Sequence, residues 1–225
     1  MKQTEPKGAV IKTKEKPFIP MFDNEALVNV VVKYPEVLIL DKPLLSAIIS
    51  GHYNLMASGY LDYAKNFIYP KAREAHSRLQ AAKKPFIPYQ AVQLYTVTYN
   101  TPPYLSTVTD HFTYTGGKAY SNRKLGDTFD VTTGRKVPLR SLFWDDSYQE
   151  VIFDQIRRQI EADKQRFLPL AGQRVKSLFR KKNYYLTEHS LVVFFPSYTL
   201  APGTNPTPSF EIPYKLLERH LKRPL

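Results

Sequence analysis

The stretch AVQLYTVTYNTPPYLSTVTDHFTYTGGKAY, residues 91–120, decides the fold class of this chain. Two runs rich in Thr, Val and Tyr, 91–100 and 105–115, are joined by Thr-Pro-Pro-Tyr, a pattern that predicts an antiparallel hairpin with a proline-stiffened loop. Gly116-Gly117, the only Gly-Gly pair in the chain, follows the second run. Because no helical pattern comes after the pair, we expect it to end a strand with positive φ angles rather than to cradle a phosphate.

Helical spacing precedes the hairpin, and a β-branched run comes before that. VNVVVKYP (28–35) predicts a strand ended by Pro35, and residues 44–79 predict two helices or one broken helix, punctuated by Gly59 and Pro70. The apolar positions of 44–79 fall into two stripes: Leu45, Ile48, Ile49, Tyr53 and Met56 in the first, and Tyr60, Ala64, Phe67 and Ile68 in the second.

After the hairpin the sequence predicts two further strand pairs, one amphipathic helix between them, and a terminal strand with a helix. Residues 128–139 predict strand, Thr-Gly turn and strand, and the next helix is expected to start at Asp146 as N-cap with Gln149 as its capping-box partner. Tyr148, Ile152, Ile156 and Ile160 form its buried stripe. Residues 184–200 then predict a hairpin, and 210–221 a short strand running into a helix.

This order of elements predicts an α+β fold. Strands come in runs and helices come in runs, which favours antiparallel sheets with helices packed on one face over repeated βαβ units. Residues 1–17 are rich in Lys, Thr and Pro, so we expect a flexible tail that extends to about residue 21.

The chain is strongly basic. Its formal net charge is +12, of which residues 111–225 contribute +8 from 19 Lys/Arg against 11 Asp/Glu. Basic clusters stand at 157–158, 180–182 and 219–223. Such a charge favours polyanions, namely nucleic acid, anionic cell-wall polymer or a membrane surface, although a solvated basic surface explains it equally well.

The absence of Cys and of long apolar runs excludes several kinds of site and a membrane span. Without Cys there is no disulfide, thiol nucleophile or thiolate metal site. No run of 18 apolar residues predicts a membrane span, and MKQTEPKGAV is not a signal peptide. Two alternatives stay open: a cytosolic chain, or one that begins after a removed signal or anchor.

No catalytic, cofactor-binding or metal-binding motif is found. Phosphate-loop, dinucleotide-binding, nucleophile-elbow and zinc-helix patterns are all missing, and the five His are scattered. Asp145-Asp146 is the only adjacent carboxylate pair, and at a helix start it is more simply a cap and a dipole partner than an acid–base pair. We therefore expect a chain that is not an enzyme and needs no cofactor.

Several motifs in a fixed order carry a family resemblance. LSTVTDHFTYTGG, TFDVTTGRKVPLRSLF, YYLTEHSLVVFFPSYTLAP and FEIPYKLL resemble the extracytoplasmic domain of the RsiV-type anti-sigma factor family, and the non-catalytic region before the deacetylase domain of PdaC. The resemblance implies two adjacent small subdomains, 22–115 (PdaC/RsiV-like) and 116–225 (RsiV C-terminal-like). It also implies an extracytoplasmic module, secreted or membrane-tethered, without catalysis of its own.

Two segments depart from the family pattern. Where the family commonly continues Tyr-Thr-Gly-Gly with Ala-His-Gly, this chain has Lys118-Ala119-Tyr120, and GTNPTPS (203–209) replaces an aromatic, Gly-containing segment. Both would lie on loops, so the ligand face is expected to differ. The candidate binding residues are Tyr114, Gly116, Gly117, Lys118, Tyr120, Arg180, Lys181, Lys182 and Tyr198.

The partner is expected to be cell-wall polymer or a protein. In RsiV the resembling domain binds lysozyme, but familiar lysozymes are basic and a +12 chain repels them at long range, which favours an anionic wall polymer or an acidic protein. A lysozyme-binding sensor stays as the first alternative. Nucleic acid fits less well, because Lys and Arg are not interleaved with aromatics in a known motif. A hydrolase using Asp145 and Asp146 fits least well, because no assembled site supports it.

Overall fold

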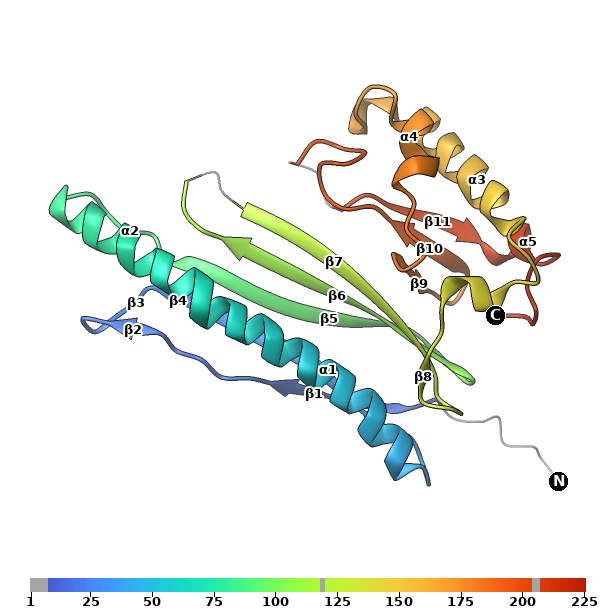
Figure 1. Ribbon diagram of the computed structural model, residues 1–225, viewed down its shortest axis with the longest axis horizontal. Coiled ribbons are helices and arrows are strands. Elements are labelled where there is room, and N and C mark those ends of the chain that lie inside the picture. The colour runs from blue at the N-terminus through green and yellow to red at the C-terminus, as the bar shows by residue number, and fades with distance from the viewer. Residues whose placement is uncertain (1–7, 118–119, 204–206) are drawn as a thin grey trace. The chain divides into compact units, whose positions relative to one another are not determined.

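The structure is a computed structural model that describes residues 8–117, 120–203 and 207–225. Within these ranges the strands form three sheets, with strand orders β1-β4-β5-β6-β7-β8, β11-β10-β9 and β2-β3 (Figure 1). The strands are β1 Val10–Glu15, β2 Met21–Phe22, β3 Glu25–Ala26, β4 Val28–Leu38, β5 Tyr89–Thr101, β6 Tyr104–Tyr114, β7 Tyr120–Asp130, β8 Arg135–Lys136, β9 Tyr184–Leu186, β10 Ser190–Phe194 and β11 Ser209–Pro213. The helices are α1 Pro43–Tyr63, the π-helix η1 Ala64–Ile68, α2 Tyr69–Ala81, the 3-10 helix η2 Leu139–Leu142, α3 Tyr148–Ala162, the 3-10 helix η3 Lys164–Arg166, α4 Ala171–Leu178 and α5 Tyr214–Leu217.

The chain divides into two compact units, each made of separate segments. Among the described residues, unit 1 consists of Gly8, Thr96–Val108 and Arg123–Leu225, and unit 2 of Ala9–Tyr95 and Thr109–Asn122. Strands β5, β6 and β7 therefore contribute residues to both units. The sequence-based boundary between 115 and 116 stays a prediction.

The predicted α+β class is confirmed, and so is the hairpin that decides it. β5 and β6 are sheet neighbours joined only by Pro102 and Pro103, whose peptide bond is cis. The predicted turn between β7 and β8 is also present. There Asp130 Oδ1 accepts hydrogen bonds from the Thr132 backbone N–H and hydroxyl, and Gly134 has a φ of 71°.

One strand pair corrects the expectation of antiparallel pairing throughout. β4 and β5 pair in parallel from Val28–Tyr89 to Val32–Gln93, because α1, η1 and α2 carry the chain back across the sheet between them. Pro35 does not end β4 as predicted. It lies beyond the stretch that pairs with β5 and opposite Thr13 of β1, where a missing N–H disturbs the sheet least.

The expected flexible tail is also corrected for residues 10–15. They form β1, which pairs antiparallel with β4 along its whole length, from Val10–Leu38 to Glu15–Lys33. Its alternating Lys and Thr are typical of an edge strand, where exposed charges prevent pairing with another chain. The part of the predicted tail before residue 8 lies outside the described residues.

Residues 43–81 form one helical rod in unit 2, with a π turn in the middle (Figure 1). The Tyr69 N–H donates to Ala64 O, five residues back, directly before Pro70. Because Pro70 has no N–H to give, the wider turn lets the helix continue past a residue that usually breaks it. Of the two predicted alternatives, two helices or one broken helix, the structure has one continuous helical rod whose irregularity is the π turn.

The core of unit 2 lies between this rod and the sheet. Tyr60, Ala64 and Ile68 belong to this core, and Ile49 and Tyr53 of the same rod are also buried, as predicted. Two predicted stripe residues, Ile48 and Phe67, are instead exposed, by 48% and 59%. The pattern was ambiguous because residues 43–61 contain no charged side chain to mark the solvent face.

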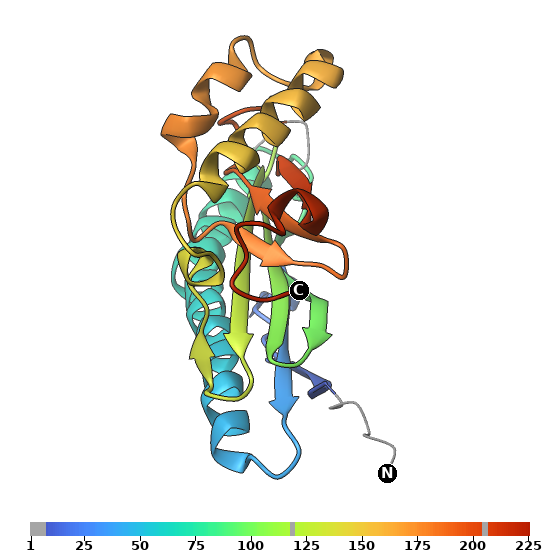
Figure 2. The same ribbon diagram turned by 90° about the vertical axis from the view of Figure 1, so that its right-hand side faces the viewer.

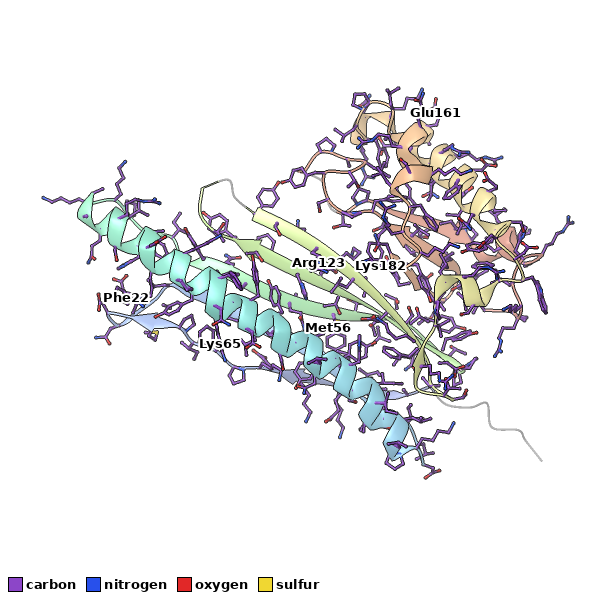
Figure 3. All side chains as sticks on the ribbon, in the orientation of Figure 1. Phe22, Met56, Lys65, Arg123, Glu161 and Lys182 are labelled. Carbon is purple, nitrogen blue, oxygen red and sulfur yellow. The ribbon has the colours of Figure 1, made fainter. Side chains whose placement is uncertain are left out.

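A short hairpin, β2–β3, is fastened to α2 in the same unit. The Tyr69 hydroxyl donates to Met21 O at 2.9 Å, and the Arg73 guanidinium lies 4.7 Å from the centre of the Phe22 ring, which is labelled in Figure 3. His76 Nε2 lies 3.2 Å from Glu25 Oε2.

The core of unit 1 lies between α3, α4 and the sheet β11-β10-β9, with α3 against β11 (Figure 2). The predicted stripe of α3 is confirmed: Tyr148, Ile152, Ile156 and Ile160 are all buried. The predicted cap is wrong. The N-cap is Ser147, which makes no capping hydrogen bond, and Asp146 instead pairs with two cations, described below.

In the described ranges, no helix combines the length and the apolar character that crossing a membrane requires.

Candidate functional site

The candidate binding residues of the sequence fall into both units. Tyr114, Gly116, Gly117 and Tyr120 belong to unit 2, where β6 ends and β7 begins. The rings of Tyr114 and Tyr89 pack edge to face, with centroids 6.4 Å apart. Gly116 and Gly117 have φ angles of 93° and 59°, which confirms the predicted positive φ. Lys118 lies outside the described residues.

The second group belongs to unit 1, and two of its three cations have structural partners. Arg180 Nη1 donates to the backbone oxygens of Ser177 and Phe179, both at 2.9 Å, at the C-terminus of α4. Lys181 Nζ lies 3.1 Å from Asp146 Oδ1. Lys182, labelled in Figure 3, is exposed and makes no ion pair within the described part of the chain.

Tyr198 is also exposed, by 59%, with a φ of 64°. Its ring packs on the backbone of Gly203, where an added Cβ would overlap it. Lys181 thus contacts Asp146, and among the described candidate binding residues no contact joins the group in unit 1 to Tyr198.

A polar cluster before α3 brings together residues that are far apart in the sequence. Asp146 Oδ1 accepts from Lys181 and also lies 3.1 Å from Arg140 Nε. The hydrogen bond from Lys181, together with the charges of Lys181 and Arg140, holds the pKa of Asp146 below its usual value. The cluster thus ties η2, the start of α3 and the segment after α4 together.

Asp145 is held on the other side of the same turn. Its Oδ1 accepts hydrogen bonds from the Ser147 backbone N–H, at 2.9 Å, and from the Ser147 hydroxyl. These two hydrogen bonds lower the pKa of Asp145. Ser147 Oγ also lies 2.8 Å from His220 Nδ1, which brings the C-terminal segment into the cluster.

Asp145, Ser147 and His220 are the residue types of a hydrolytic triad, but their order differs. In such a triad the imidazole lies between the hydroxyl and the carboxylate. Here the hydroxyl lies between the imidazole and the carboxylate, and it donates its single hydrogen bond to Asp145 Oδ1. This arrangement favours a structural role in the turn. In the described residues, no three metal-ligating side chains gather in a group that could hold a metal ion.

Trp144, the only Trp of the chain, directly precedes the two aspartates of the polar cluster. Trp144 is 65% exposed, whereas its neighbour Phe143 is fully buried and stacks on Tyr148 at 3.9 Å. Burial raises the pKa of Tyr148 to about 12. The sequence analysis missed Arg140, Trp144, Ser147 and His220; the single Trp beside the only Asp-Asp pair was the available signal.

A separate hollow of about 430 Å³ lies in unit 2, where β4 leads into α1. Two serines that line it are already used within the fold: Ser46 Oγ accepts from Ile39 N, and Ser50 Oγ accepts from Val37 N, both at 2.8 Å. These hydrogen bonds attach the end of β4 to α1, so the two serine hydroxyls have a structural role that requires no ligand.

Two family profiles match successive parts of the chain. Residues 22–118 match the family described as deacetylase PdaC, and residues 140–215 match a family described as a protein of unknown function, DUF3298. No curated protein matches the chain.

Solved structures confirm the fold over almost the whole length. A crystal structure of a DUF3298 family member from Bacteroides fragilis has a TM-score of 0.70 at 15% identity, covering 98% of this chain and 96% of that one. A DUF3298 family protein from Pseudomonas aeruginosa PAO1 has a TM-score of 0.56 at 15% identity, covering 98% and 95%. At this identity the likeness is one of fold.

Proposed function

We propose that this chain, in which a PdaC-type segment is followed by a DUF3298 segment, is a non-catalytic, extracytoplasmic binding module that recognises an anionic cell-wall polymer. The observation that carries the proposal is the set of exposed cations in unit 1 that have no ion-pair partner within the described residues. They include Arg158, Arg174, Lys182, Lys215, Arg219 and Lys222.

These cations differ from other exposed cations of unit 1, which have acidic partners. Arg157 pairs with Asp154, Lys164 with Glu161 and Arg166 with Asp163, so the charges of those three are locally compensated. An uncompensated cation contributes fully to the field that a polyanion meets, and several of them together supply sequence-independent affinity. The proposed polymer contact therefore uses the first set and not the second.

The test measures retention on immobilised poly(glycerol phosphate), with neutral dextran as the control matrix. The triple variant Arg158→Glu/Arg174→Glu/Lys182→Glu lowers the net charge from +12 to +6, because each of three reversals removes two charges. We expect retention at low salt to weaken by roughly tenfold or more. Salt should weaken retention of the parent, since the Debye length shrinks from about 10 Å at 0.1 M to about 3 Å at 1 M.

A matched variant separates the surface from the net charge. Arg157→Glu/Lys164→Glu/Arg166→Glu also gives +6 but reverses cations that already have partners. The proposal expects this variant to bind more tightly than the first triple variant. Equal retention of both variants and the parent on the polymer would refute the proposal. If the immobilised parent protein instead binds lysozyme or duplex DNA but not the polymer, those partners would be favoured.

The observation that favours a second candidate function, a hydrolase, is the Ser147–His220 contact. The binding proposal expects Ser147→Ala to retain the polymer as the parent does. Release of soluble fragments from wall polymer by the parent, lost in Ser147→Ala, would replace the binding module with an enzyme.

A further inference from the structure

Trp144 is displayed outward on a backbone that is held in place. Its N–H donates to His220 O at 3.0 Å, and its carbonyl oxygen accepts from Arg140 Nη2 at 3.1 Å. Arg140 Nη1 also donates to Phe143 O at 2.8 Å, while the Phe143 side chain is fully buried. The backbone is fixed on both sides of the indole, yet Trp144 is 65% exposed, an arrangement from which folding gains little.

The two carboxylates that follow Trp144 are each held mainly through one oxygen. The hydrogen bonds to Asp145 from Ser147 meet at Oδ1, and the ion pairs of Asp146 with Arg140 and Lys181 also meet at Oδ1. Asp146 also has a side-chain hydrogen bond with Gln149, and Oδ2 of either carboxylate takes part in none of the contacts with Ser147, Arg140 or Lys181. Each carboxylate is therefore oriented by its partners and keeps acceptor capacity for a ligand hydroxyl, since an ionised carboxylate offers about four lone-pair sites.

The charges of the cluster decide what kind of ligand it fits. Asp145 and Asp146 are balanced by Arg140 and Lys181, so the group carries no net charge. A cationic ligand gains little there and is repelled by the +12 chain, and an anionic ligand meets two carboxylates. A neutral ligand with many hydroxyl groups and an apolar face suits the indole and both carboxylates.

From these contacts we infer that Trp144 is the stacking platform of a saccharide site, on which one pyranose ring of an uncharged oligosaccharide lies flat while Asp145 and Asp146 accept its hydroxyl hydrogen bonds. The inference rests on the proposed function only in taking the saccharide to be an uncharged part of the anionic wall polymer, whose charged parts would meet the uncompensated cations instead. Arg140 and His220 are positioning residues, since they hold the backbone and the turn rather than the ring.

The single Trp makes the site directly measurable. Indole fluorescence of this chain comes from Trp144 alone. Titration of the full chain with cellohexaose and with chitohexaose, in high salt to suppress charge effects, should shift the emission to shorter wavelength and protect it from acrylamide quenching. An emission spectrum and a quenching constant that stay unchanged at saturating oligosaccharide would overturn the inference.

Variants test the roles by calorimetric titration, which does not need the indole. Trp144→Ala should weaken oligosaccharide binding roughly tenfold or more, as truncation of a central aromatic anchor does, and Trp144→Phe should retain part of the affinity. Asp145→Asn should weaken binding less than Trp144→Ala, because the amide keeps an acceptor. Phe67→Ala is the matched control: Phe67 is an aromatic of similar exposure, 59%, on η1. Equal binding by Trp144→Ala and Phe67→Ala would overturn the platform.

The two proposals fail separately. If poly(glycerol phosphate) is retained through the uncompensated cations but Trp144 emission does not respond to oligosaccharide, only the saccharide site is refuted. If oligosaccharide binds at Trp144 but the polymer is not retained, the saccharide site stands and the proposed function falls.

Discussion

Gly116 and Gly117 both have positive φ, but a side chain at each would meet different surroundings. A Cβ on Gly116 would lie 3.2 Å from Tyr89 Cε1, whereas a Cβ on Gly117 would meet nothing within 4 Å. At Gly117 the cost of a side chain therefore comes from backbone conformation alone. The sequence was sufficient to predict this, because a Gly-Gly pair directly after a strand is typical of a turn that requires positive φ.

Two variants, Gly117→Val and Gly117→Asn, test whether the cost of a side chain at this position comes from the backbone conformation. A β-branched residue resists φ = 59°, so Gly117→Val should lower the free energy of unfolding by about 1–2 kcal/mol. Asn tolerates this region, and Gly117→Asn should lose less than half as much. Urea denaturation measures both. Equal losses for Val and Asn would contradict the conformational origin of the cost.

The single Trp beside the Asp-Asp pair marks the polar cluster in the sequence, but the exposure of the Trp and the distant members of the cluster could not be predicted from it. Trp144 stands directly after Leu142 and Phe143, both buried, and nothing in the sequence says that the third apolar residue faces solvent. His220 lies 73 positions from Ser147, a distance that only the fold closes. The predicted cap at Asp146 failed because Arg140 and Lys181 compete for the same carboxylate.

At the scale of elements, the long helix shows what local patterns can and cannot predict. Gly59 and Pro70 suggested a break, but the π turn at 64–68 absorbs Pro70 and the helix continues through Gly59. β1 was missed because a charged, threonine-containing edge strand has the composition of a linker. The parallel β4–β5 pair was missed because one helical crossover inside an antiparallel pattern leaves no local signal.

Gly51 and Gly59 offer a prediction for this helix. Both are exposed in α1, and an added Cβ would meet nothing within 4 Å at either position. Gly51→Ala and Gly59→Ala should each stabilise the protein by about 0.5–1 kcal/mol, because Ala loses less backbone entropy in a helix. Thermal unfolding should show a rise of a few degrees.

Gly126→Ala is the opposite control within the same fold. A Cβ on Gly126 would lie 1.9 Å from Tyr184 O, a backbone atom that cannot move aside cheaply. This variant should unfold at a lower temperature than the parent. Destabilisation by Gly51→Ala or Gly59→Ala would mean that the exposed face of α1 contacts something that leaves no room for a methyl group.

At the scale of the molecule, the two compact units do not follow chain order. Unit 1 includes Thr96–Val108, which supplies the fully buried Leu105 and Ser106. Ser106 Oγ accepts a hydrogen bond from Leu186 N at 2.9 Å, inside unit 1. A fragment that starts at residue 116 would therefore leave a buried N–H without its partner.

This makes the predicted boundary at 115/116 testable. Fragment 116–225 should lack a cooperative thermal transition, whereas fragment 89–225, which restores Thr96–Val108, should unfold cooperatively. Circular dichroism and differential scanning calorimetry measure both. Cooperative unfolding of 116–225 at the same temperature as the longer fragment would show that the chain-order boundary is the physical one.

The sharing of β5, β6 and β7 between the two units also bears on how such a gene can change. A recombination event at the codons for residues 115 and 116 would separate Thr96–Val108 from the rest of unit 1 and leave two incomplete products. Because neither product would be complete, we expect the two halves of the coding sequence to be inherited, duplicated and lost as one block. Appended domains would be tolerated at the ends of the reading frame far more often than between its two halves.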